Sequence, residues 1–300
     1  MEYHIPIENI FALILASILV AIIFAGLIIF AKKNLINIDN FALFAGMFVW
    51  FAAVQIESIF HHFLLRYFDS KIYIYAIYGG IMAGLFEETG RLLCFLKKLK
   101  PSEFHKNNSL YYGIGHGGFE AFYLISFSNI IKVFICIYIN NGKLSEYLKK
   151  DEKSLSDLEK QLLETMKVIY SNFYKSKFFD ICFMVVWERI SAIIFHISAS
   201  VVVWYAASDF RKNSFLYYIA IGMHFFVDFL SVIFSYYVVK GNIFITEIFI
   251  FCMAIGCAFI GYKCWKYFEN NIEIKQNLII ESIESIESIN TYNNENQENQ

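Results

Sequence analysis

The feature that most constrains this chain is a series of apolar runs, each long enough to cross a lipid bilayer. Of its 300 residues, 58% are hydrophobic and only 17% are charged, more apolar surface than a soluble fold can bury. A membrane-crossing helix needs about 20 apolar residues. Seven segments satisfy this requirement, namely 7–31, 41–65, 72–96, 110–139, 178–208, 214–239 and 243–266. We therefore predict an all-α, polytopic membrane helix bundle with about seven transmembrane helices.

The runs are separated by one long polar loop and followed by a polar tail. In the loop, residues 140–177, apolar side chains recur at helical spacing: Leu155, Leu158, Leu162, Met166, Ile169 and Phe173. Ser156 and Glu159 have the spacing of a capping box, so we predict an external amphipathic helix. Residues 269–300 contain a Glu-Ser-Ile repeat and an Asn-rich end, which indicate an acidic tail that is disordered or loosely helical. The predicted units are a transmembrane domain, 1–268, and this tail, 269–300.

Basic residues in the short loops predict the orientation. They follow the first, third, fifth and seventh runs: Lys32, Lys33, Lys97, Lys98, Lys100, Lys106, Arg211, Lys212, Lys263 and Lys266. Because such residues are retained in the cytoplasm, we predict that the N-terminus is outside and the C-terminus is cytoplasmic.

The remaining composition argues against a nucleic-acid partner and against a site built from cysteines. A net charge of −2 without a basic stripe argues against nucleic acid. The six cysteines show no CxxC spacing, so we interpret them as small buried residues rather than disulfides or zinc ligands.

Charged side chains occur inside the third run, where hydrocarbon is expected. Glu87, Glu88 and Arg91 lie within an otherwise apolar stretch that is also rich in glycine. Each charge costs a few kcal/mol at the bilayer centre, so such residues are paired or functional. On a helix Arg91 can reach either acid, which leaves one carboxylate for chemistry. An ion pair that only fixes helix register is the structural alternative.

Other ionisable residues are predicted at a similar depth. At about 1.5 Å per residue from the cytoplasmic ends of the runs, the depths are about 14 Å for Glu87, 9 Å for His116, 15 Å for Glu120, 18 Å for His196, 15 Å for His224 and 21 Å for Asp228. His116 and Glu120 share a helix face, as do His224 and Asp228, and Asp228 can hold the tautomer of His224. Four helices thus direct ionisable groups to one band, which predicts a single functional site. Glu57, Glu188 and Arg189 fall outside this band, and we interpret them as structural, interfacial or paired.

At these positions the chain resembles the YhfC family of membrane peptidases, within the glutamate-type intramembrane proteases that include CAAX prenyl endopeptidases, bacteriocin-processing relatives and PrsW-like proteases. The matching segments are Phe86–Arg91, Gly115–Glu120, Phe195–His196 and His224–Asp228. Two residues rather than three separate the acids from Arg91. Glu120 stands where CAAX-type enzymes have histidine, and Asp228 where many have asparagine. These differences argue against prenylated substrates and leave the hydrolytic chemistry intact.

The resemblance implies an intramembrane endopeptidase of a bacterial plasma membrane, acting on membrane-inserted or lipid-delivered peptides without a cofactor. In this interpretation Glu87 is the general base for a water, and Glu88 shares its proton or holds Arg91. His116 or Glu120 positions the water. His224, oriented by Asp228, donates to the oxyanion, with His196 as a second donor.

Three alternatives remain. A zinc peptidase could use His116, His196 and His224 with Glu87 or Glu120, although no His-Glu-x-x-His motif occurs and Arg91 opposes a dication. Chains of acids and histidines also form proton relays, so a proton-coupled transporter is the second. The third is a non-catalytic immunity or scaffold protein.

Overall fold

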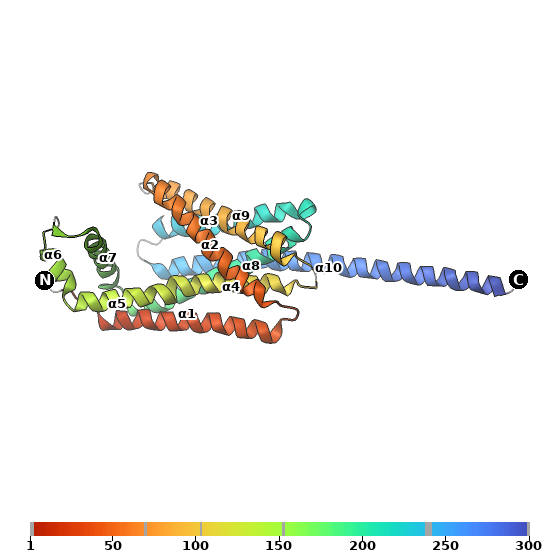
Figure 1. Cartoon of the computed structure of the whole chain (residues 1–300), viewed down its shortest axis with the longest axis horizontal. Helices are drawn as coiled ribbons and strands as arrows, with labels where there is room; N and C mark the ends of the chain where they lie inside the picture. The colour runs from red at the N-terminus through yellow and green to blue at the C-terminus, as the bar shows by residue number, and fades with distance from the viewer. Residues whose placement is uncertain (1–2, 69–70, 103, 152–153, 238–241, 299–300) are drawn as a thin grey trace.

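The computed structural model of the chain describes residues 3–68, 71–102, 104–151, 154–237 and 242–298, and all regular structure in this part is helical. The long helices run roughly along one direction (Figure 1). The α-helices are α1 (Ile7–Asn34), α2 (Asn40–Leu64), α3 (Ile72–Cys94), α4 (Asn107–Ala121), α5 (Ser128–Asn140), α6 (Lys143–Lys149), α7 (Asp157–Phe173), α8 (Val185–Ser208), α9 (Phe210–Tyr237) and α10 (Ile243–Glu298), of which α6 is short and α7 stands across the others. The all-α prediction is confirmed.

The number of membrane-crossing helices agrees in outline with the sequence. Six helical rods in the described residues are long and apolar enough to cross a membrane: Ile7–Asn34, Asn40–Leu64, Asn107–Asn140, Asp180–Ser208, Phe210–Tyr237 and Ile243–Asn270. The third rod joins α4 and α5 through a π-helical turn, Phe122–Phe127. The one predicted segment that is not among the six is 72–96, which forms α3. Its second half carries two glutamates and an arginine, and it packs against α2 and α9.

α8 lies at the centre of the bundle. Of its most apolar stretch 78% is buried, against 22–33% in the other five rods, because α4, α9 and α10 all pack against it. Small residues such as Ser198, Ala199 and Ser200 face these neighbours and are buried. His196 is carried by this helix and is therefore placed in the protein interior.

α4 approaches its neighbours most closely at glycines. A Cβ atom on Gly115 would lie 2.1 Å from the backbone oxygen of Leu43 in α2. A Cβ atom on Gly117 would lie 2.9 Å from Cβ of His196 in α8. No larger residue fits at either contact without moving a helix. The glycines on both sides of His116 therefore determine how deeply α4 is packed between α2 and α8.

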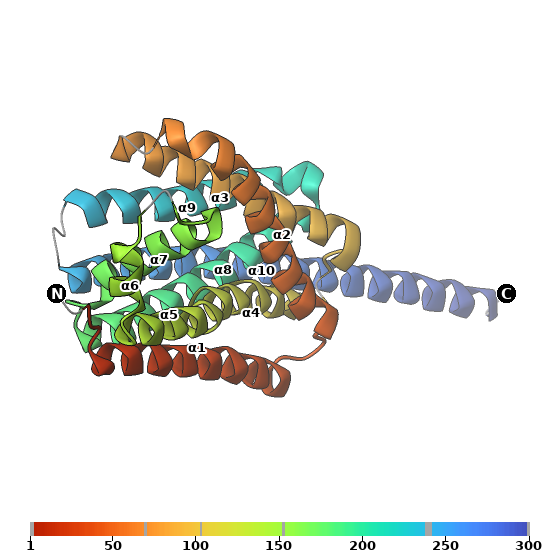
Figure 2. The same ribbon diagram turned by 60° about the vertical axis from the view of Figure 1, so that its left-hand side comes forward.

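The polar loop forms a small helical unit at one end of the bundle. Figure 2 shows α6 and α7 beside one end of α1 and α5. α7 begins with the predicted capping box, in which Ser156 and Glu159 bond reciprocally, so the amphipathic helix is confirmed. Its buried face comprises Leu163, Met166 and Ile169. The assignment of Leu158 to this face is wrong, since that side chain is 76% exposed. At 100° per residue it falls at the edge of the face and in the first turn.

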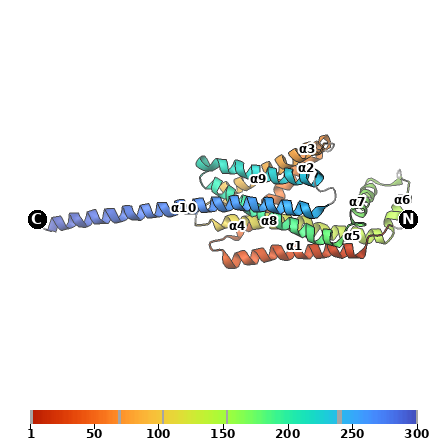
Figure 3. The same cartoon turned by 180° about the vertical axis from the view of Figure 1, so that it is seen from behind.

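The C-terminal tail is helical. Of the two expectations for residues 269–300, disordered or loosely helical, the structure has the helical one, since α10 continues to Glu298 and extends beyond the bundle (Figure 3). Residues 299–300 lie outside the described residues. Before leaving the bundle, Phe268 stacks on Tyr205 and Glu269 pairs with Lys106. The helix can continue because neither glycine nor proline occurs after Gly261. The functional division at 268 stays a prediction.

Replacing Gly115 by alanine should lower the thermal stability of the bundle, because the new methyl group must push α4 away from α2. Overpacking of this kind costs about 1–3 kcal/mol. Gly79 provides a matched control, since nothing lies within 4 Å of a Cβ added there. Gly79→Ala should leave the melting temperature unchanged or raise it, because alanine is the better helix former. Thermal unfolding of both variants in one detergent tests this, and equal melting temperatures would contradict the close approach.

Candidate active site

The predicted site residues form one connected network in the bundle interior. The network contains all eight predicted residues: Glu87, Glu88 and Arg91 from α3, His116 and Glu120 from α4, His196 from α8, and His224 and Asp228 from α9. Residues from four helices therefore meet, as the common depth predicted.

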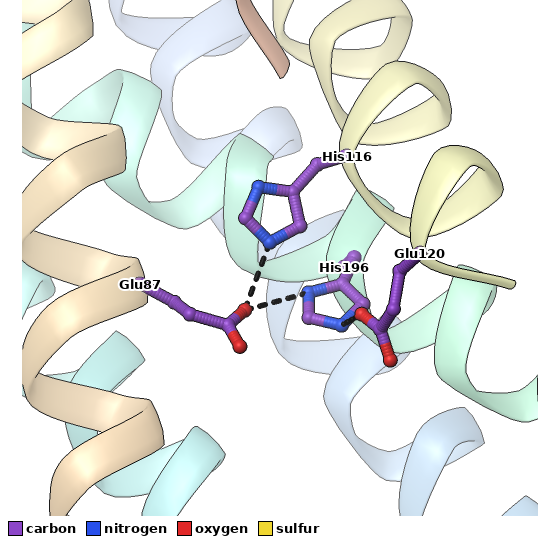
Figure 4. Close-up of side chains that lie close together, drawn as sticks. All are labelled: Glu87, His116, Glu120 and His196. Carbon is purple, nitrogen blue, oxygen red and sulfur yellow. Dashed lines mark hydrogen bonds and ion pairs between the residues drawn. The ribbon is translucent and has the colours of Figure 1, made fainter. Parts of the chain in front are cut away.

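Glu87 lies at the centre of this network. Its Oε2 atom is 2.8 Å from Nε2 of His116, within hydrogen-bonding distance. The same oxygen is 4.0 Å from Nδ1 of His196 and 3.9 Å from Nε2 of His224. Figure 4 shows the carboxylate pointing from α3 toward the imidazoles of His116 and His196. One oxygen of Glu87 thus faces three imidazole rings.

Glu88 connects Arg91 of α3 with His224 of α9. The side chains of Glu88 and Arg91 are both completely buried, and Arg91 Nη1 donates to Glu88 Oε2. The other oxygen, Oε1, lies 2.9 Å from Nδ1 of His224. Glu88, and not the predicted Asp228, therefore makes the hydrogen bond to this imidazole. Asp228 is one turn further along α9, and its Oδ2 lies 3.7 Å from the opposite ring nitrogen, Nε2. The Nδ1 edge of the ring faces α3, where Asp228 does not reach.

Arg91 also reaches α8. Its Nη2 atom lies 3.2 Å from Nδ1 of His196, and because a guanidinium group can only donate, Nδ1 is the acceptor. Nε2 of the same ring is 2.7 Å from Oε2 of Glu120. These two atoms are close but not aligned as a hydrogen bond, and Oε2 has no hydrogen-bond partner among the described residues.

Arg189 belongs to the site, although the sequence placed it at the membrane interface or in a pair. The pairing is confirmed, since Arg189 donates to Glu188 and its Nη1 is 3.0 Å from Oε1 of Glu120. Its side chain is only 14% exposed and lines the same cavity as Glu87. The available signal was its position two turns before His196 on one helix face. Glu57, interpreted as structural, is buried with His61 4.0 Å away.

A polar cavity adjoins the network. Its volume is about 180 Å³, enough for several water molecules. Its lining includes Glu87, Glu120, Arg189, His196, His224 and Asp228, together with residues of α10. Water can therefore be accommodated beside carboxylates in the membrane interior, which hydrolysis requires.

Four of the residues could hold a metal ion. One ligand atom each from Glu87, His116, Glu120 and His196 lies within 4.8 Å of the others. Zinc bonds of about 2.0–2.1 Å in a tetrahedron place neighbouring ligand atoms roughly 3.3 Å apart, and the closest pairs here are 2.7–2.8 Å apart. Glu120 Oε2 and His116 Nδ1 are buried without hydrogen-bond partners among the described residues. His224, a predicted ligand, is outside this group because Glu88 holds it.

The charges around the cavity also accommodate a cation. Five carboxylates, those of Glu87, Glu88, Glu120, Glu188 and Asp228, meet only the two guanidinium groups of Arg91 and Arg189. If all are ionised, three negative charges remain, and a divalent ion with one imidazolium would neutralise them. The sequence-based objection that Arg91 repels a dication is weakened, because Glu88 already balances its charge.

Comparison with known proteins gives two findings. A family model described as YhfC intramembrane metalloprotease matches residues 16–250, a range that contains every site residue named above. The chain is also similar to an uncharacterized membrane protein YhfC of Bacillus subtilis (strain 168), with 34% identity over 146 residues, 48% of this chain and 51% of the relative. The chain thus spans about half the length of the curated relative it matches. No solved structure matches the chain.

Removing the guanidinium of Arg91 should strongly destabilise the protein, because it leaves Glu88 buried without its partner. Breaking a buried pair from one side costs about 3–5 kcal/mol. Arg211→Ala is the matched control, because Arg211 is exposed just after α9 begins. Thermal unfolding in detergent should show a large loss for Arg91→Ala and almost none for Arg211→Ala. Equal stability of the two variants would contradict the buried pair.

Proposed function

The chain belongs to the YhfC intramembrane metalloprotease family, and from this premise we propose that it is a metal-dependent intramembrane endopeptidase that cleaves membrane-associated peptides. The observation that carries the proposal is the meeting of two imidazoles and two carboxylates beside a polar cavity in the bundle interior. Two histidines with a carboxylate are also a ligand set of zinc peptidases.

Glu87, His116, Glu120 and His196 would hold the ion, and zinc suits these nitrogen and oxygen donors. When bound, zinc lowers the pKa of a coordinated water and polarises a carbonyl group.

His224 supplies a proton donor that lines the cavity. Its Nδ1 is fixed by Glu88, so its Nε2 faces the cavity between Glu87 and Asp228. In a site of this polarity, a fixed N–H group stabilises the negative charge that develops on the attacked carbonyl oxygen. We assign this role to His224.

Two residues position these groups. Glu88 holds His224 from α3, and Arg189 holds Glu120 from α8. Because each of these side chains is largely buried, its geometry is fixed before a substrate arrives. With a metal bound, His196 would offer a ring nitrogen to the ion in place of its contact with Arg91.

The proposed substrate is a membrane-inserted or lipid-delivered peptide, since the site lies among helices of bilayer-crossing length. The proposed location is a bacterial plasma membrane, supported by the Bacillus relative. The N-outside orientation is supported by the basic loop residues.

A metal-free glutamate mechanism is the second candidate. It is favoured by the direct hydrogen bond between Glu87 and His116 and by the contact of Arg91 with His196, both of which form among the protein's own side chains. Here Glu87 would take the proton from water. The wider relationship to CAAX-type enzymes remains part of this hypothesis.

Metal content separates the two candidates. Protein purified without chelators should contain about one zinc ion per chain by mass spectrometry, and His116→Ala should lose it. His105→Ala is the matched control, because His105 is an exposed histidine outside the site and should keep the ion. An active wild-type protein without metal would establish the glutamate mechanism instead. Zinc retained by a folded His116→Ala variant would contradict the ligand assignment.

Peptide hydrolysis in proteoliposomes tests the catalytic roles. Glu87→Gln should abolish cleavage with little change in fold, and His224→Ala should reduce it about 100- to 1000-fold. The double variant should lose no more than Glu87→Gln, because residues that act in one step are not additive. Glu164→Gln, at an exposed position on α7, should keep full activity. Unimpaired cleavage by Glu87→Gln would refute the site, and proton uptake without any cleavage would favour a transporter.

A further inference from the structure

A second, larger cavity adjoins the active-site cavity. It has a volume of about 610 Å³ and lies between α9 and α10. Ser231 and Ile250 line both cavities, so the two adjoin at these residues. Three further polar side chains, those of Ser235, Thr246 and Glu247, line only the larger one.

A polar stripe on α9 leads from one cavity to the other. His224, Asp228, Ser231 and Ser235 are spaced four, three and four residues apart and therefore share one face of the helix. The stripe is about 16 Å long at 1.5 Å per residue. It runs from the active site toward the end of the bundle at which α6 and α7 lie (Figure 1). An extended peptide could follow this face outward from the active site.

Glu247 of α10 lines the larger cavity, and its carboxylate is paired with no cation among the described residues. It is 6% exposed, and its Oε2 atom has no hydrogen-bond partner among the described residues. The hydroxyl of Thr246 is also buried and unpartnered within this part of the chain. Among the described residues no lysine or arginine lines the cavity, and Arg189 is already bonded to Glu188 and Glu120. Within this part of the chain the carboxylate of Glu247 thus has no cationic partner, and a ligand could provide one.

We propose that Glu247 binds the basic side chain of a substrate residue three to five positions from the scissile bond. The assignment rests on the proposed peptidase function. Ser231 and Ser235 are about 10 and 16 Å along α9 from His224, which an extended peptide spans in three to five residues. A lysine or arginine there would pair with Glu247. The hydroxyls of Ser231, Ser235 and Thr246 would bond the peptide backbone, whose polar groups cannot remain unpaired inside a membrane.

Binding by a catalytically inactive protein tests the assignment. The probes are fluorescent transmembrane peptides of leucine and alanine with one lysine at successive positions, each paired with a norleucine peptide. Vesicles of phosphatidylglycerol contain no lipid amine that could compete. At one position, the lysine peptide should bind Glu87→Gln about tenfold more tightly than its norleucine partner. Adding Glu247→Gln should remove this preference, whereas adding the matched control Glu164→Gln should not. Glu247→Lys should prefer a peptide with glutamate at the same position.

The wild-type protein then relates binding to cleavage. Mass spectrometry of its products identifies the scissile bond, which should lie three to five residues from the preferred lysine. No lysine preference at any position would overturn the proposal. So would an equal loss of affinity for lysine and norleucine peptides in the Glu247→Gln variant. Charge-dependent binding without cleavage would support the role of Glu247 and instead refute the proposed peptidase function.

Discussion

An arginine buried in a bilayer must have a partner, and the arrangement of this site depends on the partner that Arg91 takes. Arg91 and Glu88 are fully buried one turn apart on α3, where the low dielectric makes separation of the pair costly. Each has a second contact on another helix. Arg91 bonds His196 of α8, and Glu88 bonds His224 of α9. One ion pair therefore ties three helices together and sets the orientation of two imidazoles.

The other half of the site is positioned by packing. The glycines that flank His116 leave no room for a Cβ atom, so the backbone of α4 lies directly against α2 and α8. This brings His116 to Glu87 and Glu120 to His196. The half of the site that the Glu88–Arg91 ion pair holds and the half that close packing of α4 positions thus meet at Glu87. The active-site geometry depends on both, since a shift of α4 alone would separate the proposed metal ligands.

The sequence predicted those properties that the bilayer itself imposes. Run lengths predicted the helices, and counting residues from the membrane border placed the site residues at one depth, where the structure brings them together. Depth contains no information on the rotation of a helix about its axis. For that reason Asp228 was assigned to His224 in place of Glu88, and His224 was grouped with the metal ligands. Arg189 was left out of the site because its depth falls outside the band. In the tail, polar composition left disorder and a loose helix both open, and the structure has a helix because no glycine or proline interrupts it.

The same low dielectric that requires the Glu88–Arg91 pair also explains where the protein would accept cations. At Glu87 and Glu120, two carboxylates converge with two imidazoles, and the five carboxylates of the surrounding network outnumber its two guanidinium groups, which favours a divalent ion. Glu247 is a single carboxylate in a cavity whose other polar lining side chains carry hydroxyl groups, which suits one monovalent charge. The polar face of α9 connects the two places. Under the proposed function, the bundle has one acidic centre for chemistry and another for selecting the peptide, each requiring a cation that its own helices do not supply.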